Sequence, residues 1–228
     1  MHDALTFPFS RRQALRFLAA SAVLAGLPGI ACAGAYEDYF GAVKLDNIKL
    51  VRSLLQRGFD PNTVEEERGE TGLIIAVRED ASKVFDLLLN TKEVDLNARA
   101  RNGDSALMIA AYKGRYDAAK ALLDKGAEPN QTGWAALHYA AAAGNNQIVQ
   151  LLLDHSAYID AESPNQTTPI MMAARGGHIL TVKLLLDEGA DLTLKNGAGM
   201  TALDFARAGD FKDIVEGLTY RLKKAGKL

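Results

Sequence analysis

The sequence contains a single cysteine, Cys32, among its 228 residues. No disulfide within the chain is therefore possible, and zinc sites built from paired cysteines are excluded. Basic residues are not in excess, because 26 lysines and arginines stand against 28 acidic residues, a formal net charge of −2. A nucleic-acid-binding domain would carry a basic face, so this composition argues against nucleic acid as a partner.

The sequence motifs of common enzymes are also missing. The chain has no G-x-S-x-G nucleophile turn, no G-x-x-x-x-G-K-[ST] phosphate loop and no G-x-G-x-x-G dinucleotide-binding turn. Its histidines show no H-x-x-H or H-E-x-x-H spacing, so we expect neither a metal ion nor a cofactor. A catalytic site assembled from distant parts of the chain stays conceivable, but no residue pattern identifies one, and we expect a protein that is not an enzyme.

The N-terminal segment has the order of an export signal. Arg11, Arg12 and Arg16 precede an uncharged apolar stretch over residues 17–30, and the small residues after it fit the A-x-A cleavage pattern. The stretch is too short to span a bilayer, which takes about 20 apolar residues. An ordinary helix packed on the domain would leave this order unexplained. We therefore expect residues 1–35 to be a signal peptide, and the mature chain to lie in a bacterial periplasm without a membrane anchor.

The sequence leaves two export routes. The segment "SRRQALR" over residues 10–16 resembles the twin-arginine motif, although that motif usually has phenylalanine where Ala14 stands, and the apolar stretch also suits the general secretory pathway. A lipid-modified cysteine normally follows a leucine three residues earlier, and Gly29 in that place argues against lipidation of Cys32. Cleavage after Ala35 would leave a chain without thiols, which suits an oxidising compartment.

From residue 36 onward the sequence repeats itself. Alanines recur at intervals of 34, 34, 30, 33 and 33 residues, at Ala42, Ala76, Ala110, Ala140, Ala173 and Ala206. Five of these alanines end similar six-residue segments: "TGLIIA", "SALMIA", "AALHYA", "TPIMMA" and "TALDFA". Leucine-rich triplets follow in four of these units. A fixed period near 33 residues indicates an array of repeats.

Each recurring residue type fits a place in a helix–turn–helix unit. Hydroxyl residues are placed to accept a hydrogen bond from a free amide at the start of each first helix, at Thr71, Ser105, Thr168 and Thr201. Alanine keeps the first helix thin, and the leucines form the apolar face of the second. Glycines let the chain reverse between them in a left-handed conformation, at Gly114, Gly144 and Gly177. Such short helices are marginal alone in water, so neighbouring units must cover them.

The recurring text resembles the T-P-L-H-x-A signature of ankyrin repeats, which have the same period. The resemblance implies an all-α ankyrin-repeat solenoid of about six helix-turn-helix units with β-hairpin-like fingers. The expected units span residues 36–65, 66–98, 99–130, 131–160, 161–194 and 195–228. The first and last units depart from the signature, as terminal repeats do. Ala135 replaces the capping threonine of the fourth unit, where we expect softer local structure.

The resemblance also implies a partner surface, since ankyrin arrays hold proteins in a concave groove lined by fingers and first helices. The groove positions of this chain hold Glu70, Arg78, Asp104, Tyr112, Lys113, Trp134, Tyr139, Met172 and Arg175. Tryptophan, tyrosine and arginine dominate binding hot spots, so we expect Trp134 to matter first, together with Tyr112, Tyr139 and Arg175. The alternative is that Trp134 only packs on the neighbouring finger. The same resemblance gives His138 the role of tying adjacent loops together.

Taken together, these features predict a monomeric interaction module in the periplasm that binds a protein without catalysis. An exported enzyme that it protects or inhibits is one such partner. A secreted effector that binds a host protein is the alternative, and an enzyme with an unrecognised site is the third. The identity of the partner lies beyond the sequence, because one repeat architecture serves many targets.

Overall fold

The computed structural model describes residues 31–227. The arginines and the apolar stretch of the predicted export signal lie outside the described residues. Residues 35–228 form one compact unit. The described part of the chain holds twelve helices, and its only extended pairings are two isolated bridges. The all-α prediction is therefore confirmed. None of the described helices is both long enough and apolar enough to cross a membrane.

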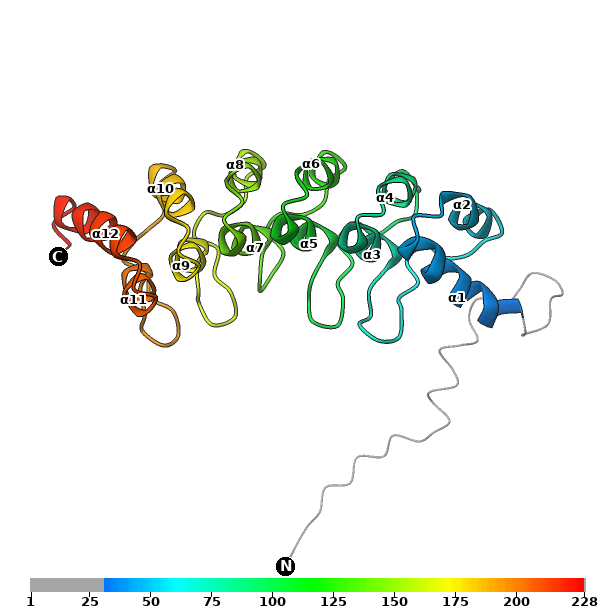
Figure 1. The fold of residues 1–228 in the computed structure, drawn as a ribbon, viewed down its shortest axis with the longest axis horizontal. Coiled ribbons are helices and arrows are strands. Elements are labelled where there is room, and N and C mark those ends of the chain that lie inside the picture. The colour runs from blue at the N-terminus through cyan, green and yellow to red at the C-terminus, as the bar shows by residue number, and fades with distance from the viewer. Residues whose placement is uncertain (1–30, 228) are drawn as a thin grey trace, which may run out of the picture. The chain divides into compact units, whose positions relative to one another are not determined.

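The helices alternate between two rows (Figure 1). The first helices of the units are α1 (Ala31–Lys44), α3 (Gly72–Glu79), α5 (Ala106–Lys113), α7 (Ala136–Ala143), α9 (Pro169–Arg175) and α11 (Ala202–Ala208). The second helices are α2 (Ile48–Gln56), α4 (Ser82–Leu89), α6 (Tyr116–Asp124), α8 (Asn146–Asp154), α10 (Ile179–Asp187) and α12 (Lys212–Lys224). The loops that lead to the next unit extend as fingers on the side of the first helices away from the second helices (Figure 1). The predicted cleavage point after Ala35 falls in the first turns of α1.

Hydroxyl caps start three of the first helices as predicted. The Oγ atoms of Thr71 and Ser105 each accept an amide hydrogen bond at 3.4 Å, and that of Thr201 accepts one at 3.3 Å. Thr168 is different, because its buried hydroxyl has no hydrogen-bond partner. Its own amide instead lies 3.4 Å from the sulfur of Met171. Thr168 is the N-cap residue of α9, but the predicted hydrogen bond to its hydroxyl is wrong.

The turn between the two helices of a unit needs one left-handed residue. Gly114, Gly144 and Gly177 take it with φ of 69°, 71° and 73°, as predicted. Aspartate takes it in the other units, and Asp46 (φ 51°) uses its carboxylate to accept a hydrogen bond from the amide of Val84 in the next unit at 2.9 Å. Short polar side chains tolerate this conformation because they bond to nearby backbone.

Packing between units explains the alternation of alanine and leucine. Ala110, Ala140 and Ala173 are fully buried where consecutive first helices lie side by side, and only a methyl group lets the backbones approach so closely. Leu152 of α8 is also fully buried, and burying such a side chain contributes roughly 2 kcal/mol. One apolar cluster of buried residues runs through the array from Tyr39 to Leu222.

Side-chain amides join the loops of successive units. Asn62 donates to the carbonyl of Glu93 and accepts from the amide of Asp95, both at 2.7 Å. Asn130 makes the same two kinds of bond with the following unit, at 2.8 and 2.7 Å. Asp160 stands at the corresponding place one unit later and, while ionised, can only accept. These bonds hold one unit in register with the next.

Candidate protein-binding groove

Three of the predicted groove residues occupy equivalent places on the fingers. Glu70, Asp104 and Trp134 each stand directly before a helix N-cap, and each follows a glycine with a left-handed φ of 66°, 88° and 86°. The finger therefore reverses just before these residues. The side chain of Glu70 contacts α3, and those of Asp104 and Trp134 both contact α7.

The predicted residues of the second unit bind each other. Glu70 is only 5% exposed and forms an ion pair with Arg78, which also pairs with Glu79 at 2.9 Å. Burial raises the pKa of Glu70, and the nearby guanidinium of Arg78 opposes that rise. A partner would have to break this pair to use either charge.

Asp104 and Tyr139 are also joined. The hydroxyl of Tyr139 on α7 donates to the carboxylate of Asp104 on the preceding finger. Burial, reinforced by this hydrogen bond, raises the pKa of Tyr139. The ring of Tyr112 lies edge-on to that of Tyr139, with centroids 6.4 Å apart and planes at 88°. The contacts fix Tyr139, while Tyr112 stays 58% exposed.

An apolar recess of about 210 Å³ lies between these aromatic side chains. It is lined by Tyr112, Trp134, His138, Tyr139, Ala142 and Met172. Trp134 packs edge-on against His138, with ring centroids 5.2 Å apart and planes at 77°. Four predicted residues, from the three consecutive units of α5, α7 and α9, therefore meet in one place.

Sequence reasoning missed His138 and Ala142 as lining residues. Ala142 occupies the helix position that Arg78, Tyr112 and Arg175 occupy in other units. Its small side chain opens the recess. Comparing this position between units was the signal that could have located it.

Two exposed cations stand on the helices that flank α7. Lys113 ends α5 and Arg175 ends α9, and within residues 31–227 neither forms an ion pair. The recess therefore has an apolar floor, with one cation on each helix beside α7 and the carboxylate of Asp104 bonded to Tyr139 at its wall. The same described residues contain no cluster of three or more potential metal-ligating side chains. The arrangement is chemically suited to binding.

Comparison with known proteins identifies the repeat. The family described as ankyrin repeats (3 copies) matches residues 40–133 and 137–225. The chain belongs to the ankyrin-repeat family. Ankyrin repeats indicate a protein–protein interaction module.

Three relatives illustrate how ankyrin repeats occur in larger proteins. The chain is 34% identical over 160 residues to human "SH3 and multiple ankyrin repeat domains protein 2". The matched region covers 68% of this chain and 9% of that protein. It is 30% identical over 162 residues to human "Transient receptor potential cation channel subfamily A member 1", covering 66% and 14% respectively. It is 30% identical over 179 residues to mouse "B-cell lymphoma 3 protein homolog", covering 75% and 40%. The chain thus matches less than half the length of each.

Proposed function

We propose that this protein binds a partner protein in the groove over α5, α7 and α9, without catalysing a reaction. The observation that carries the proposal is the apolar recess between Tyr112, Trp134, Tyr139 and Met172. Trp134 and Tyr139 are already held by His138 and Asp104. A preformed surface loses little side-chain freedom on association, so most of the contact energy is available for binding.

The chemistry of the recess suggests the partner's contact residues. Its volume of about 210 Å³ suits a single aliphatic or aromatic side chain. Lys113 and Arg175 on either side favour carboxylates next to that side chain. The partner segment is therefore one apolar residue accompanied by aspartate or glutamate. Opposite charges around an apolar centre mainly increase specificity and the rate of association.

A capture experiment with matched variants tests the groove. We expect Trp134→Ala and Tyr112→Ala to weaken partner capture by roughly tenfold or more, because aromatic residues in such pockets act as hot spots. Tyr158→Ala is the control, because Tyr158 is 68% exposed and does not line the recess. Equal capture by all three variants, with unchanged circular dichroism, would remove the recess from the proposal.

We further propose that the chain acts as a monomer in a bacterial periplasm. The support for the location is the order of arginines, apolar stretch and small residues within residues 1–35. An exported enzyme that the groove protects or inhibits fits this location. Cell fractionation tests it: the protein should appear in periplasmic extract as a shortened chain. Recovery from the culture medium or from host cells would instead favour the secreted-effector alternative.

A further inference from the structure

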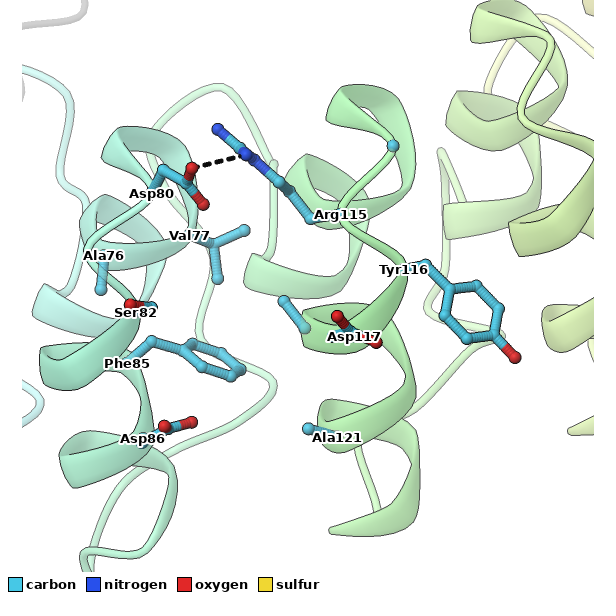
Figure 2. Close-up of a pocket in the computed structure, with 12 residues that line it drawn as sticks. Ala76, Val77, Asp80, Ser82, Phe85, Asp86, Arg115, Tyr116, Asp117 and Ala121 are labelled. Atoms are coloured by element: carbon cyan, nitrogen blue, oxygen red, sulfur yellow. Dashed lines mark ion pairs between the residues drawn. The ribbon is translucent and has the colours of Figure 1, made fainter.

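A second cavity lies between the second helices α4 and α6, in the row away from the fingers. Its volume is about 600 Å³. Figure 2 shows the residues that line it. Phe85 and Val77 line one side, and Ala118 and Ala121 of α6 line the other. The groove residues described above do not contribute to it. We call this cavity the α4–α6 cleft.

Small side chains in α6 explain why the cleft exists. Ala118 and Ala121 stand where α8 carries Ile148 and Leu151. The two missing larger side chains leave α6 without the bulk to fill the space beside Phe85. Larger residues at the two alanine positions would therefore close the cleft.

Charged residues surround the apolar walls. Three carboxylates, Asp80, Asp86 and Asp117, and one guanidinium, that of Arg115, line the cleft. The Nη1 atom of Arg115 lies 2.7 Å from Asp80, and Figure 2 shows this pair at the top of the cleft. Asp86 and Asp117 form no ion pair within residues 31–227. They stand on opposite walls, one on α4 and one on α6 (Figure 2).

We propose that the α4–α6 cleft binds a lysine or arginine side chain of a partner polypeptide. The aliphatic stem of such a side chain would lie against Phe85 and the two alanines, as stems of long cationic side chains do on apolar surface. The charged end would lie between Asp86 and Asp117. The Phe85 ring can add attraction for a cation near its face.

Charge and shape exclude the other simple occupants. An anion would be repelled by the two uncompensated carboxylates. A purely apolar ligand would take water away from them without giving a partner in return, which is unfavourable. A cation with an apolar stem can pack against the apolar walls and pair with the carboxylates of Asp86 and Asp117. This site is independent of the proposed groove and selects for the opposite charge.

Peptide titration tests the proposal directly. The probe is acetyl-Gly-Leu-Lys-Leu-Gly-amide, added to the purified isotope-labelled protein, and the readout is the change in backbone amide chemical shifts. We expect shifts over residues 80–86 and 115–121. The same peptide with glutamate in place of lysine should leave these amides unchanged. Equal binding of both peptides, or shifts confined to other parts of the chain, would overturn the proposal.

Two kinds of variant separate the cleft from general effects. Ala121→Leu fills the cleft with the residue that α8 carries at Leu151, and Asp86→Asn with Asp117→Asn removes the free charges while keeping the shape. Both changes should weaken binding of the lysine peptide by roughly tenfold, because each charge pair or cation–aromatic contact of this kind contributes only modestly to the binding free energy. Native-like binding by the double asparagine variant would overturn the proposal even if Ala121→Leu failed to fold.

The groove variant Trp134→Ala serves as the matched control. It should bind the lysine peptide as the native protein does, because Trp134 does not line the cleft. Loss of peptide binding in this variant would place the peptide in the groove and contradict the cleft assignment. Failure of the cleft experiment would leave the groove proposal unaffected, since that proposal is tested by partner capture.

Discussion

The Nε2 atom of His138 lies 2.9 Å from the carbonyl oxygen of Thr167, and this contact joins the fourth unit to the finger of the fifth. The other ring nitrogen, Nδ1, accepts a hydrogen bond from the amide of Ala135 at 3.1 Å. A carbonyl oxygen can only accept, so Nε2 carries the proton and the ring is neutral. The ring of His138 therefore satisfies the amide of the N-cap residue Ala135, and its contact with Thr167 agrees with the loop-tying role that the resemblance implied.

This geometry predicts a loss of stability in mild acid. Burial lowers the pKa of His138, so the unfolded chain takes up a proton first as the pH falls below about 6.5. The free energy of unfolding should therefore decrease from that pH down to the lowered pKa, and be fully retained above it. Urea denaturation at pH 7.5 and pH 5.5 measures the difference.

Methionine is the matched substitution, because Met108 and Met171 occupy the same place in neighbouring units. His138→Met should cost about 1–2 kcal/mol at pH 7.5, through two lost hydrogen bonds. The variant should also lose the part of the acid dependence that His138 causes. An unchanged difference between the two pH values would show that other groups are responsible.

Asp160 offers a stabilising substitution. Its carboxylate accepts from the amide of Asp191 at 3.1 and 3.2 Å, where Asn62 and Asn130 both accept and donate. Burial raises the pKa of Asp160, and the charge of Asp191 adds to the rise. Asp160→Asn should therefore raise the free energy of unfolding by about 1 kcal/mol at pH 7, by supplying the missing donor.

The gain from Asp160→Asn should depend on pH. Because the folded pKa is raised, the native carboxylate destabilises the fold above that pKa, and the penalty disappears below the unfolded value of about 3.9. The difference between variant and native protein should therefore shrink toward acid. Asn130→Asp is the reverse control and should destabilise at pH 7. A gain that is constant with pH would argue against this account.

The two threonine caps should respond in opposite ways to valine. Thr168→Val replaces a buried hydroxyl that has no partner, and should raise stability by about 1 kcal/mol. Thr201→Val removes a hydroxyl that accepts from the amide of Asp204 and donates to its carboxylate at 2.7 Å, and should lower stability by about 1 kcal/mol. Thermal melting of both variants measures the contrast. Equal losses would mean that the Thr168 hydroxyl is satisfied in solution.

Breaking the ion pair of the second unit should lower the stability of the fold. Arg78→Met leaves the nearly buried carboxylate of Glu70 without its guanidinium, and should lower the free energy of unfolding by about 2 kcal/mol. Adding Glu70→Gln should restore most of that loss, because the unpaired charge is gone. A double-mutant cycle in urea gives the coupling between the two residues. Additive losses would show that the pair is not coupled.

The fold was predictable because its signals are local and repeated. Alanine recurring every 30 to 34 residues fixes the buried side of each first helix, and the turn glycines fix where the chain reverses. The candidate groove was predictable as a set of positions. Which of those positions are free was not, because the pairing of Glu70 with Arg78 depends on how the finger folds against its helix.

The sequence by itself determined the repeat and the order of the helices, since spacing and residue size act within a single unit. Only the tertiary structure decided where the surface is hollow. The recess beside Ala142 and the α4–α6 cleft beside Ala121 arise between neighbouring units. Each depends on the residue that the adjacent unit presents, and that pairing exists only when the units pack together.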